Sequence, residues 1–488
     1  MRDGAILRAD VYRPPGDGPW PVLLVRTPYG KQDPGVLARL NPVGAAGRGY
    51  LVVIQDCRGR FRSDGDWAPL VHESADGYDT VAWAARLPGS DGRVAMYGPS
   101  YLGHTQWAAI AARPPGLCAA MPEFTWSNPH DGLITRGGAY ELGLMTQWTL
   151  SLGINVLERR FADRPEERQR QLAELNSAIG ELTTRTCWET SPGESIRRLG
   201  LPAPSSDVES TGVSPSPHIP MLIVAGWYDC FLQGSLDSYV SARNVGAPAS
   251  LIVGPWSHDG PSPLADELEW LDRQLASPTH EPNVRIFVTG SNEWRNLPTW
   301  PPEATDAAWY LDADGRLSPA PPDAASPQDT FVHDPNAPVP ACGGALLLSP
   351  EFPAGPLDQR EIEKRDDVLT YTSAALREPL EVVGRIRLHL FADSTASTTD
   401  WVARLCDVDT DGVSRNLTDG IVRAHQPHTN EHSIDLWSTA HVFLPGHRIR
   451  MQITGSCFPR WDRADGARQT VQHDAARPSR LILPVRHV

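Results

Sequence analysis

The sequence lacks long apolar runs and runs of basic residues. No apolar stretch approaches the roughly 20 residues that a bilayer-spanning helix needs, which argues against a membrane protein. Lys and Arg number 44 against 59 Asp and Glu, a formal net charge of −15. Because no basic run stands out against this acidic background, nucleic acid is not expected as a partner. The chain also lacks internal repeats and a low-complexity tail.

The cysteines form no recognisable pattern. Their number is odd, and no Cys-x-x-Cys pair or zinc-ligand spacing occurs. Scattered thiols of this kind are typical of a reducing compartment, and residues 1–8 are too polar for a signal peptide. We therefore expect a cytoplasmic protein with free thiols and no metal site. The seven are Cys57, Cys118, Cys187, Cys230, Cys342, Cys406 and Cys457.

One serine lies in a strand–turn–helix context. Residues 94–97 are a short apolar run, Gly98-Pro99-Ser100 reads as a turn, and residues 101–112 have helical composition. Such a turn places a serine at a helix N-terminus, where backbone N–H groups favour developing negative charge. The motif departs from Gly-x-Ser-x-Gly, because its second glycine is Gly103, one place late. Ser100 is the candidate nucleophile, with a helix N-cap as its plain alternative.

Two further candidates follow in the chain order of an α/β-hydrolase, which is Ser, Asp, His. Residues 219–230 show a buried-strand pattern that ends at Asp229, and residues 250–258 read as another apolar strand that ends at His258. An imidazole can take the proton of Ser100, and a carboxylate can hold the imidazole tautomer and stabilise the imidazolium. A turn or loop role is the alternative for each residue taken singly. Together, three strand-end residues in this order predict a catalytic triad.

Motifs spread along nearly the whole chain carry a family resemblance. They include Ala9-Asp10-Val11-Tyr12-Arg13-Pro14, Val25-Arg26-Thr27-Pro28-Tyr29, Gly98-Pro99-Ser100-Tyr101-Leu102-Gly103, Ala225-Gly226-Trp227-Tyr228-Asp229, Gly254-Pro255-Trp256-Ser257-His258 and Phe443-Leu444-Pro445-Gly446-His447. In these the sequence resembles the cocaine esterase / X-prolyl dipeptidyl aminopeptidase (CocE/NonD-type) family of α/β-hydrolases. The late glycine belongs to this family's serine motif. The resemblance implies an oxyanion hole formed by the Tyr29 hydroxyl and the Tyr101 backbone N–H.

The first part of the chain predicts a mostly parallel sheet. Residues 1–127 alternate apolar strands, such as 50–55, with helical stretches, such as 75–87, and this alternation is typical of a helix-covered sheet. The same pattern resumes over residues 215–299. The resemblance places Met1 where the family's first domain is already under way, so an upstream strand is expected to be absent.

Two other regions have a different character. Residues 128–214 have helical composition, and a Pro/Ser-rich stretch at 202–218 leads back into the sheet. The resemblance implies that this insertion is the family's helical cap. Residues 300–488 contain many short strands with Gly and Pro between them, which predicts an all-β sandwich. The resemblance implies a jelly roll there. We expect an α/β-hydrolase core in two parts, 1–127 and 215–299, with a cap insertion and a C-terminal β-sandwich.

Aromatic residues are candidates for an acyl pocket. The resemblance implies that Trp148, nine positions after Ala139, and Phe231, two after Asp229, line such a pocket. Aromatic walls suit an apolar or aromatic acyl group, and ordinary packing is the alternative for each residue. Trp126 and Trp227 are further candidates.

No acidic residue closely follows Asp229, because residues 230–234 read Cys-Phe-Leu-Gln-Gly. In the family branches that take a free α-amino group, carboxylates pair with the substrate ammonium, since an unpaired buried cation is costly. Their absence here favours a neutral or apolar acyl group. Glu123 and Glu141 remain as other possible sources of charge.

The sequence therefore predicts a serine hydrolase that cleaves a small-molecule ester, or an amide, through an acyl-enzyme and without a cofactor. One alternative is a biosynthetic acyltransferase that uses the same triad. A second is an X-prolyl or amino-acyl peptidase. A third is a hydrolase fold that binds a partner through its β-sandwich without catalysis. The oligomeric state stays open, with a homodimer as one candidate.

Overall fold

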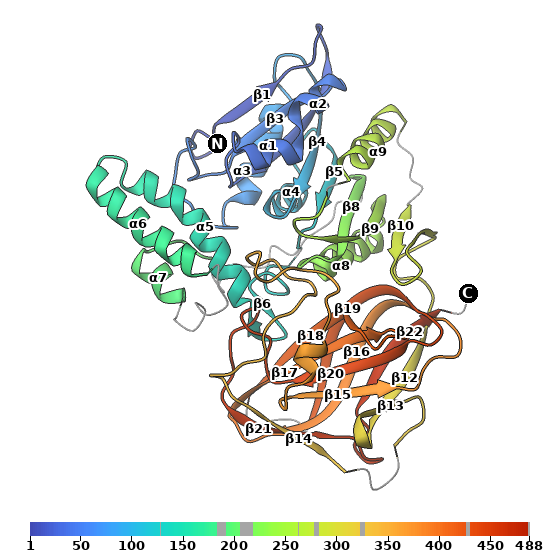
Figure 1. Ribbon diagram of the computed structural model, residues 1–488. Helices are drawn as coiled ribbons and strands as arrows, with labels where there is room; N and C mark the ends of the chain where they lie inside the picture. The colour runs from blue at the N-terminus through green and yellow to red at the C-terminus, as the bar shows by residue number, and fades with distance from the viewer. Residues whose placement is uncertain are drawn as a thin grey trace.

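The computed structural model describes residues 1–126, 128–182, 192–204, 218–261, 263–277, 283–322, 327–425 and 430–486. A helix-covered sheet forms one end of the molecule, and the C-terminal strands form the other (Figure 1). Three helices of the chain's middle region project to one side. Within the described ranges, no helix combines the length and the apolar character that a bilayer crossing needs.

Nine strands form the first sheet, in the order β1-β3-β2-β4-β5-β8-β9-β10-β11. Neighbouring strands from β3 through to β10 run parallel, and only β1 and β11 pair antiparallel at the edges. The predicted parallel sheet is thus confirmed. The strands are β1 Ala9–Tyr12, β2 Trp20–Thr27, β3 Leu51–Asp56, β4 Ser90–Pro99, β5 Leu117–Glu123, β8 Met221–Tyr228, β9 Ala249–Ser257, β10 Val284–Val288 and β11 Glu293–Leu297.

Successive apolar side chains of the central strands alternate between the two faces of the sheet and contribute to a separate core on each face. In β2, Leu23 and Val25 pack into one cluster of buried side chains, whereas Val22 and Leu24 pack into another. Successive side chains of a strand point to opposite faces, so a run of apolar residues is buried only when helices cover both faces. The covering helices are α1 Pro34–Leu40, α2 Pro42–Gly47, α3 Glu73–Ala84, α4 Tyr101–Ala112, α8 Leu232–Asn244 and α9 Leu264–Ala276.

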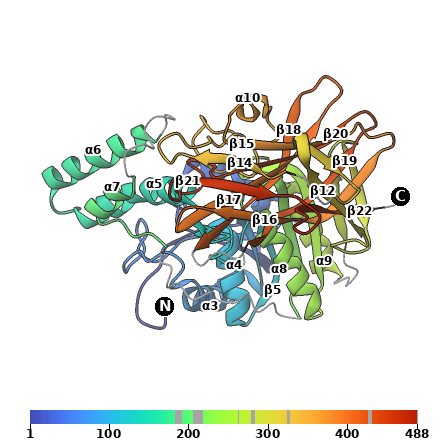
Figure 2. The ribbon, with the colours of Figure 1, turned by 90° about the horizontal axis from the view of Figure 1, so that it is seen from below.

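The segment between β5 and β8 leaves the sheet and forms the projecting helices. It contains β6 Thr135–Arg136, β7 Ala139–Tyr140, α5 Leu142–Arg160, α6 Pro165–Glu181 and α7 Pro192–Arg198. Figure 2 shows α6 and α7 furthest from the rest of the molecule. Only Leu175 and Ala178 of α6 are buried, whereas α5 is buried along much of its length. Residues 205–217 of the predicted Pro/Ser-rich stretch lie outside the described residues, as does Cys187.

Eleven strands form the C-terminal sheet. Its order is β14-β21-β16-β22-β12-β13-β15-β20-β17-β18, and β19 pairs with β16. β18 and β19 also lie close together, and the sheet folds over an apolar core. The strands are β12 Thr305–Asp312, β13 Arg316–Ser318, β14 Asp329–His333, β15 Val368–Ser373, β16 Leu380–Ser394, β17 Thr398–Val408, β18 Ser414–His425, β19 Glu431–Phe443, β20 Arg448–Thr454, β21 Ala467–Gln472 and β22 Arg480–Arg486. Two short helical turns, η2 Ala313–Gly315 and α10 Arg360–Glu363, connect them.

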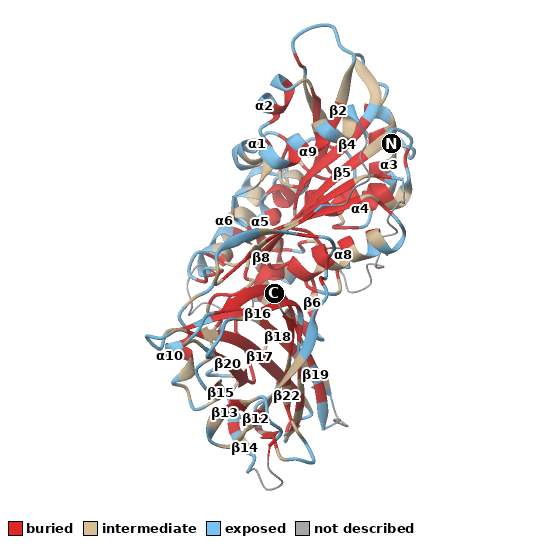
Figure 3. Ribbon diagram, turned by 90° about the vertical axis from the view of Figure 1, so that its right-hand side faces the viewer, coloured by how far each residue is buried: buried red, intermediate tan, exposed pale blue. Residues whose placement is uncertain are grey.

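The strands of both sheets are largely buried, and exposure concentrates in loops and outer helices (Figure 3). The predicted boundary at 299/300 falls between β11 and β12, and the one at 127/128 adjoins residue 127, which the structure does not describe. The predicted boundary at 214/215 lies outside the described residues. All six cysteines within the described ranges have free thiols.

Candidate active site

Ser100 lies at the turn between β4 and α4, in a conformation that non-glycine residues rarely adopt. Its φ is 60° and its ψ is −127°. The Ser100 N–H donates to the carbonyl of Glu123 at 2.9 Å, and the Ser100 carbonyl accepts the Thr125 hydroxyl at 2.8 Å. Strained backbone of this kind persists only where the surroundings hold it, and here the end of β5 supplies the partners. The side chain therefore projects from a fixed, strained turn at the start of α4.

The late glycine has a packing reason. A Cβ at Gly103 would lie 2.6 Å from the Thr125 Cβ, closer than real Cβ contacts allow. The first turn of α4 thus packs directly against the chain that leaves β5. Gly98 has a φ of 118°, a left-handed conformation that favours glycine. Both glycines serve the turn that presents Ser100.

Asp229 and His258 meet at the carboxyl ends of two neighbouring parallel strands, β8 and β9. The His258 Nδ1 lies 2.6 Å from the Asp229 Oδ2, and the Asp229 Oδ1 accepts the Phe231 N–H at 2.7 Å. Asp229 is fully buried and His258 nearly so. A carboxylate at Nδ1 makes that nitrogen the proton donor, which leaves Nε2 free to accept a proton.

Ser100 and His258 line one cavity of about 350 Å³, together with Tyr29 and Trp148. The walls are mostly apolar, with Val36 and Leu102 among them. The structure thus brings the candidate nucleophile, the candidate base, one candidate oxyanion donor and one predicted pocket residue to the same cavity. That arrangement can carry out nucleophilic attack on a carbonyl with proton transfer to an imidazole.

The two candidate oxyanion donors both lie beside Ser100. The Tyr29 hydroxyl hydrogen-bonds with the Ser100 hydroxyl and accepts the Trp148 indole N–H at 3.2 Å. Burial raises the pKa of Tyr29, so the phenol keeps its proton. Tyr101 begins α4, and the first N–H groups of a helix have no intrahelical acceptor. The Tyr101 side chain points the other way and donates to Glu73 at 2.9 Å.

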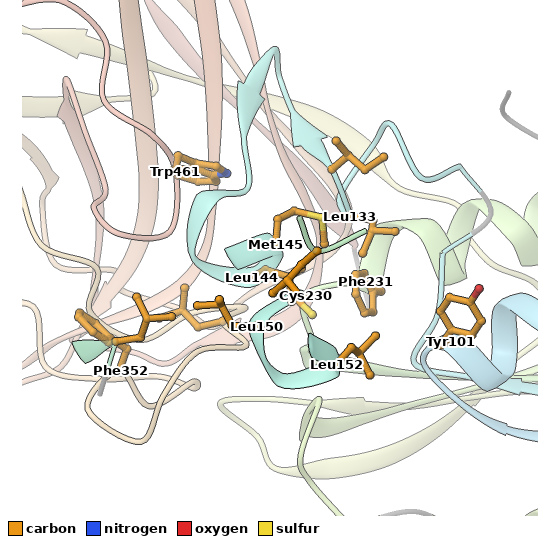
Figure 4. Close-up of a cluster of buried hydrophobic side chains, with 14 of the residues drawn as sticks. Tyr101, Leu133, Leu144, Met145, Leu150, Leu152, Cys230, Phe231, Phe352 and Trp461 are labelled. Atoms are coloured by element: carbon orange, nitrogen blue, oxygen red, sulfur yellow. The ribbon is translucent and has the colours of Figure 1, made fainter. Parts of the chain in front are cut away.

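The remaining predicted pocket residues lie at different distances from the cavity. The Phe231 ring packs edge-on against His258, with 5.1 Å between ring centroids, and Trp126 lies behind it at 4.6 Å. Figure 4 shows Phe231 beside Cys230, between α5 and Tyr101. Trp227 lies elsewhere, in a separate cluster with Trp300, so the structure does not bring it to the other candidates.

Several cavity residues were missed by the sequence analysis, and two of them come from distant parts of the chain. Arg39, from α1, donates to the His258 carbonyl at 3.2 Å and forms an ion pair with Glu123 at 3.3 Å. Leu347, from the C-terminal part, reaches the same cavity. The apolar run at 345–348 in a Gly- and Pro-rich loop is a weak signal for Leu347, and no local pattern marks Arg39.

Cys230 lies close to the hydrogen-bonded pair of Asp229 and His258, with its Sγ 3.9 Å from the His258 Nδ1. Asp229, Cys230 and His258 are the one group of His, Cys, Asp and Glu side chains in the described ranges with metal-ligand spacing. The 2.6 Å bond between His258 and Asp229 already engages two of the three. Burial raises the pKa of the Cys230 thiol well above its ordinary value, so this sulfur stays protonated and is a poor nucleophile.

Comparison with known proteins places this geometry in a family. Residues 3–260 match the model of the X-Pro dipeptidyl-peptidase (S15 family), and residues 277–482 match that of the X-Pro dipeptidyl-peptidase C-terminal non-catalytic domain. Cocaine esterase of Rhodococcus sp. (strain MB1 Bresler) is 34% identical, over 99% of this chain and 97% of the relative. The chain belongs to the X-Pro dipeptidyl-peptidase (S15) family.

Solved structures of this family's fold cover the whole chain. An aminopeptidase from a marine sediment Thaumarchaeota archaeon has a TM-score of 0.79 at 25% identity, covering 100% of this chain and 95% of that one. An α-amino acid ester hydrolase has a TM-score of 0.77 at 24% identity, with the same coverages. The S15 membership confirms the predicted fold, an α/β-hydrolase with a C-terminal all-β region, and the prediction that the protein is a serine hydrolase.

Proposed function

We propose that this S15-family protein hydrolyses a small-molecule ester of a neutral acyl group, with Ser100 as nucleophile, His258 as base and Asp229 as its orienting carboxylate. One arrangement carries the proposal: His258 bonds Asp229 at 2.6 Å and lines, together with Ser100, the same cavity of about 350 Å³. The 34% identity to a cocaine esterase over almost the full chain supports ester chemistry.

The reaction follows from these positions. The Ser100 Oγ attacks the ester carbonyl carbon while its proton passes to the His258 Nε2. The carbonyl oxygen becomes an oxyanion, which accepts hydrogen bonds from the Tyr29 hydroxyl and the Tyr101 N–H. His258 then protonates the departing alkoxide, and an acyl-Ser100 ester remains. Water, deprotonated by His258, attacks this ester and releases the acid, with Ser100 regaining its proton.

The acyl group is inferred from the cavity. Its volume of about 350 Å³ is at the low end of the range of about 300–1,000 Å³ for ligand sites, and its walls are mostly apolar. Trp148 supplies an aromatic wall, with Phe231 and Trp126 packed behind His258. A short aliphatic or single-ring aromatic acyl group fits these dimensions.

The two carboxylates that the sequence offered for recognising an amine are engaged elsewhere. Glu123 pairs with Arg39, and Glu141 accepts the Trp461 indole N–H at 2.8 Å. Both side chains are buried. A substrate ammonium needs a carboxylate of its own, so the X-prolyl or amino-acyl peptidase alternative would have to use Asp33 or Asp259, which line the cavity. The acyltransferase alternative uses the same site with an alcohol or amine in place of water.

A substitution and a substrate panel test the proposal. Ser100→Ala is expected to abolish ester hydrolysis and fluorophosphonate labelling with the fold intact, while Ser397→Ala, at an exposed serine of the C-terminal part, retains both. With the wild-type protein, p-nitrophenyl acetate, butyrate and benzoate are expected to be cleaved faster than a dipeptidyl-proline anilide. Normal turnover by Ser100→Ala would exclude the triad, and a preference for the anilide would reinstate the peptidase. Product analysis with added alcohols or amines separates hydrolysis from acyl transfer.

A further inference from the structure

Trp148 makes a hydrogen bond that an ordinary hydrophobic wall residue does not make. Its indole N–H points to the Tyr29 hydroxyl oxygen at 3.2 Å. An indole N–H can only donate, so the direction of this bond is certain: the Tyr29 oxygen accepts. The phenol has a single O–H, which the bond from Trp148 leaves available to donate inside the cavity, where Ser100 is the neighbouring hydroxyl.

The direction of the bond from Trp148 to Tyr29 affects which hydroxyl protons remain available at Tyr29 and Ser100. If Tyr29 donates to the Ser100 Oγ, the Ser100 proton remains available for His258, whose Nδ1 already faces Asp229. In that arrangement the indole donates to the phenol and the phenol to the serine, and the serine proton is the one that the imidazole takes in the proposed reaction. When the serine oxygen attacks, the same Tyr29 O–H is oriented for the oxyanion that forms beside it.

A second link joins helix α5 to the loop of Tyr29, four residues after Trp148. Trp148 lies on α5, and the Leu152 carbonyl of the same helix accepts an Arg60 N–H at 3.1 Å. The Arg60 Nε donates to the Pro28 carbonyl, next to Tyr29, at 2.7 Å. Arg60 is 2% exposed. The helix α5 and the loop that carries Tyr29 are thus tied together at two points, one through Trp148 and one through Arg60.

The Trp148 ring is itself held in place. It stacks on Tyr101, with ring centroids 6.0 Å apart and an interplanar angle of 21°, and it meets Trp67 at 6.5 Å. Because the Trp148 ring is already held in place, little conformational entropy is lost in ordering it when the transition state forms. Hydrogen bonds in a chain also polarise one another, so an indole donor makes the Tyr29 O–H a stronger donor to an oxyanion.

We propose that Trp148 is a positioning residue for the oxyanion hole, acting through Tyr29, in addition to forming a wall of the acyl cavity. The inference rests on the proposed oxyanion role of Tyr29. Helix α5 thus contributes to transition-state stabilisation through Trp148, and this role is separate from acyl-group recognition.

A double-mutant cycle on kcat tests the proposal. Trp148→Phe keeps an aromatic ring and removes the N–H, and kcat is expected to fall about fivefold, the size of one lost neutral hydrogen bond, with little change in KM. In the Tyr29→Phe background the same substitution is expected to change kcat less than about twofold, because its target is gone. An equal fivefold loss in both backgrounds would overturn the positioning role.

Substrate dependence separates the two roles of Trp148. A positioning defect lowers kcat by the same factor for p-nitrophenyl acetate and p-nitrophenyl benzoate, whereas the loss of a wall affects mainly the benzoate. A loss confined to the benzoate would therefore also overturn the proposal. Trp148→His, a smaller ring that keeps an N–H, is the second variant and is expected to lose less kcat than Trp148→Phe.

Trp67→Phe is the matched control. Trp67 contacts the Trp148 ring, and its indole N–H has no hydrogen-bond partner among the described residues. Its effect on kcat is expected to be the same with and without Tyr29→Phe. The outcomes also separate this inference from the proposed function. Activity in Ser100→Ala would remove the triad, whereas a costly Tyr29→Phe with no coupling to Trp148 would remove only the positioning role.

Discussion

Tyr29 shows how much one side chain's role depends on its surroundings. In the sequence it is an aromatic residue after a strand, for which packing is an adequate explanation. In the structure its hydroxyl lies between the Ser100 hydroxyl and the Trp148 indole, and burial raises its pKa. A protonated phenol in a mostly apolar cavity is a strong candidate for stabilising an oxyanion, since a hydrogen bond is electrostatically stronger where the dielectric is low.

The role of Tyr29 gives a prediction at the residue scale. Tyr29→Phe keeps the ring and removes one donor, so the transition state should lose more stabilisation than the bound substrate. We expect kcat to fall by about 10²–10³-fold, the usual cost of one oxyanion donor, with KM nearly unchanged. Steady-state kinetics on p-nitrophenyl esters, with circular dichroism as the fold control, measures this. A fall below about fivefold would leave Tyr29 as a packing residue.

At the scale of elements, the junction between α4 and the end of β5 decides whether the turn that carries Ser100 can form. A Cβ at Gly103 would meet the Thr125 Cβ at 2.6 Å, and no side-chain rotation relieves this contact, because the backbone sets the position of both Cβ atoms.

Gly103→Ala is therefore expected to destabilise the protein by about 1–3 kcal/mol and to lower kcat together with the melting temperature. Gly180→Ala in α6 is the matched control, because a Cβ there meets nothing within 4 Å and alanine favours a helix. Thermal denaturation and ester kinetics on the two variants make the comparison. Equal stability of Gly103→Ala and wild type would show that α4 can shift without harm.

The helix α9 places a carboxyl group against the end of β5. Glu267 is 1% exposed, its Oε1 has no hydrogen-bond partner among the described residues, and burial together with Glu123 raises its pKa well above the ordinary value. Because the folded pKa exceeds the unfolded one, the unfolded chain loses this proton first as pH rises above about 4.3. Above that pH, the buried Glu267 lowers the free energy of unfolding. This loss grows with pH until the pH passes the pKa of Glu267 in the folded protein.

Glu267→Gln removes this cost, since an amide does not ionise. We expect the variant to gain stability relative to wild type as pH is raised from 5 to 8, measured by chemical denaturation at each pH. Glu269→Gln, at an exposed carboxylate of the same helix paired with Arg273, is the control and should show no such trend. A difference between Glu267→Gln and wild type that does not change with pH would contradict the raised pKa.

At the scale of the whole molecule, a buried charge cluster joins the middle region to the C-terminal strands. Arg136 of β6 and Arg460 both bond to Asp419 of β18, at 3.2 Å and 2.8 Å, and all three side chains are 3% exposed. The Arg136 guanidinium also lies 3.6 Å from the centroid of the Trp437 ring. Burial and the nearby Arg460 lower the pKa of Arg136 to about 10, which reflects the cost of placing two cations together.

Asp419→Asn would leave those two guanidinium groups without their shared carboxylate. Removing one partner of a buried ion pair typically costs about 3–5 kcal/mol, so we expect a large fall in the denaturation midpoint and loss of ester hydrolysis at a lower temperature. Asp358→Asn, at an exposed carboxylate paired with Arg360, is expected to cost at most about 1 kcal/mol. Similar midpoints for the two variants would show that Asp419 does not join the two regions.

Strand ends were the most predictable part of the site. Ser100, Asp229 and His258 each follow an apolar run, and their order along the chain matches one fold. Parallel connectivity then brings the carboxyl ends of β4, β8 and β9 to the same edge of the sheet, whatever the details of packing. Local patterns were sufficient here because both the strand and its end are visible in a short window of sequence.

Contacts between distant segments were decided only by the tertiary structure. Trp148 and Tyr29 are 119 residues apart, Leu347 enters the cavity from the C-terminal part, and Arg39 reaches the His258 carbonyl from α1. In the sequence, Trp227 and Trp126 were equally good candidates for the pocket, yet Trp227 packs in a different hydrophobic cluster. The periodicity of a strand or helix determines which face a residue lies on. Which side chain, and which atom, it then meets depends on how separate elements pack, and that leaves no trace in the local sequence.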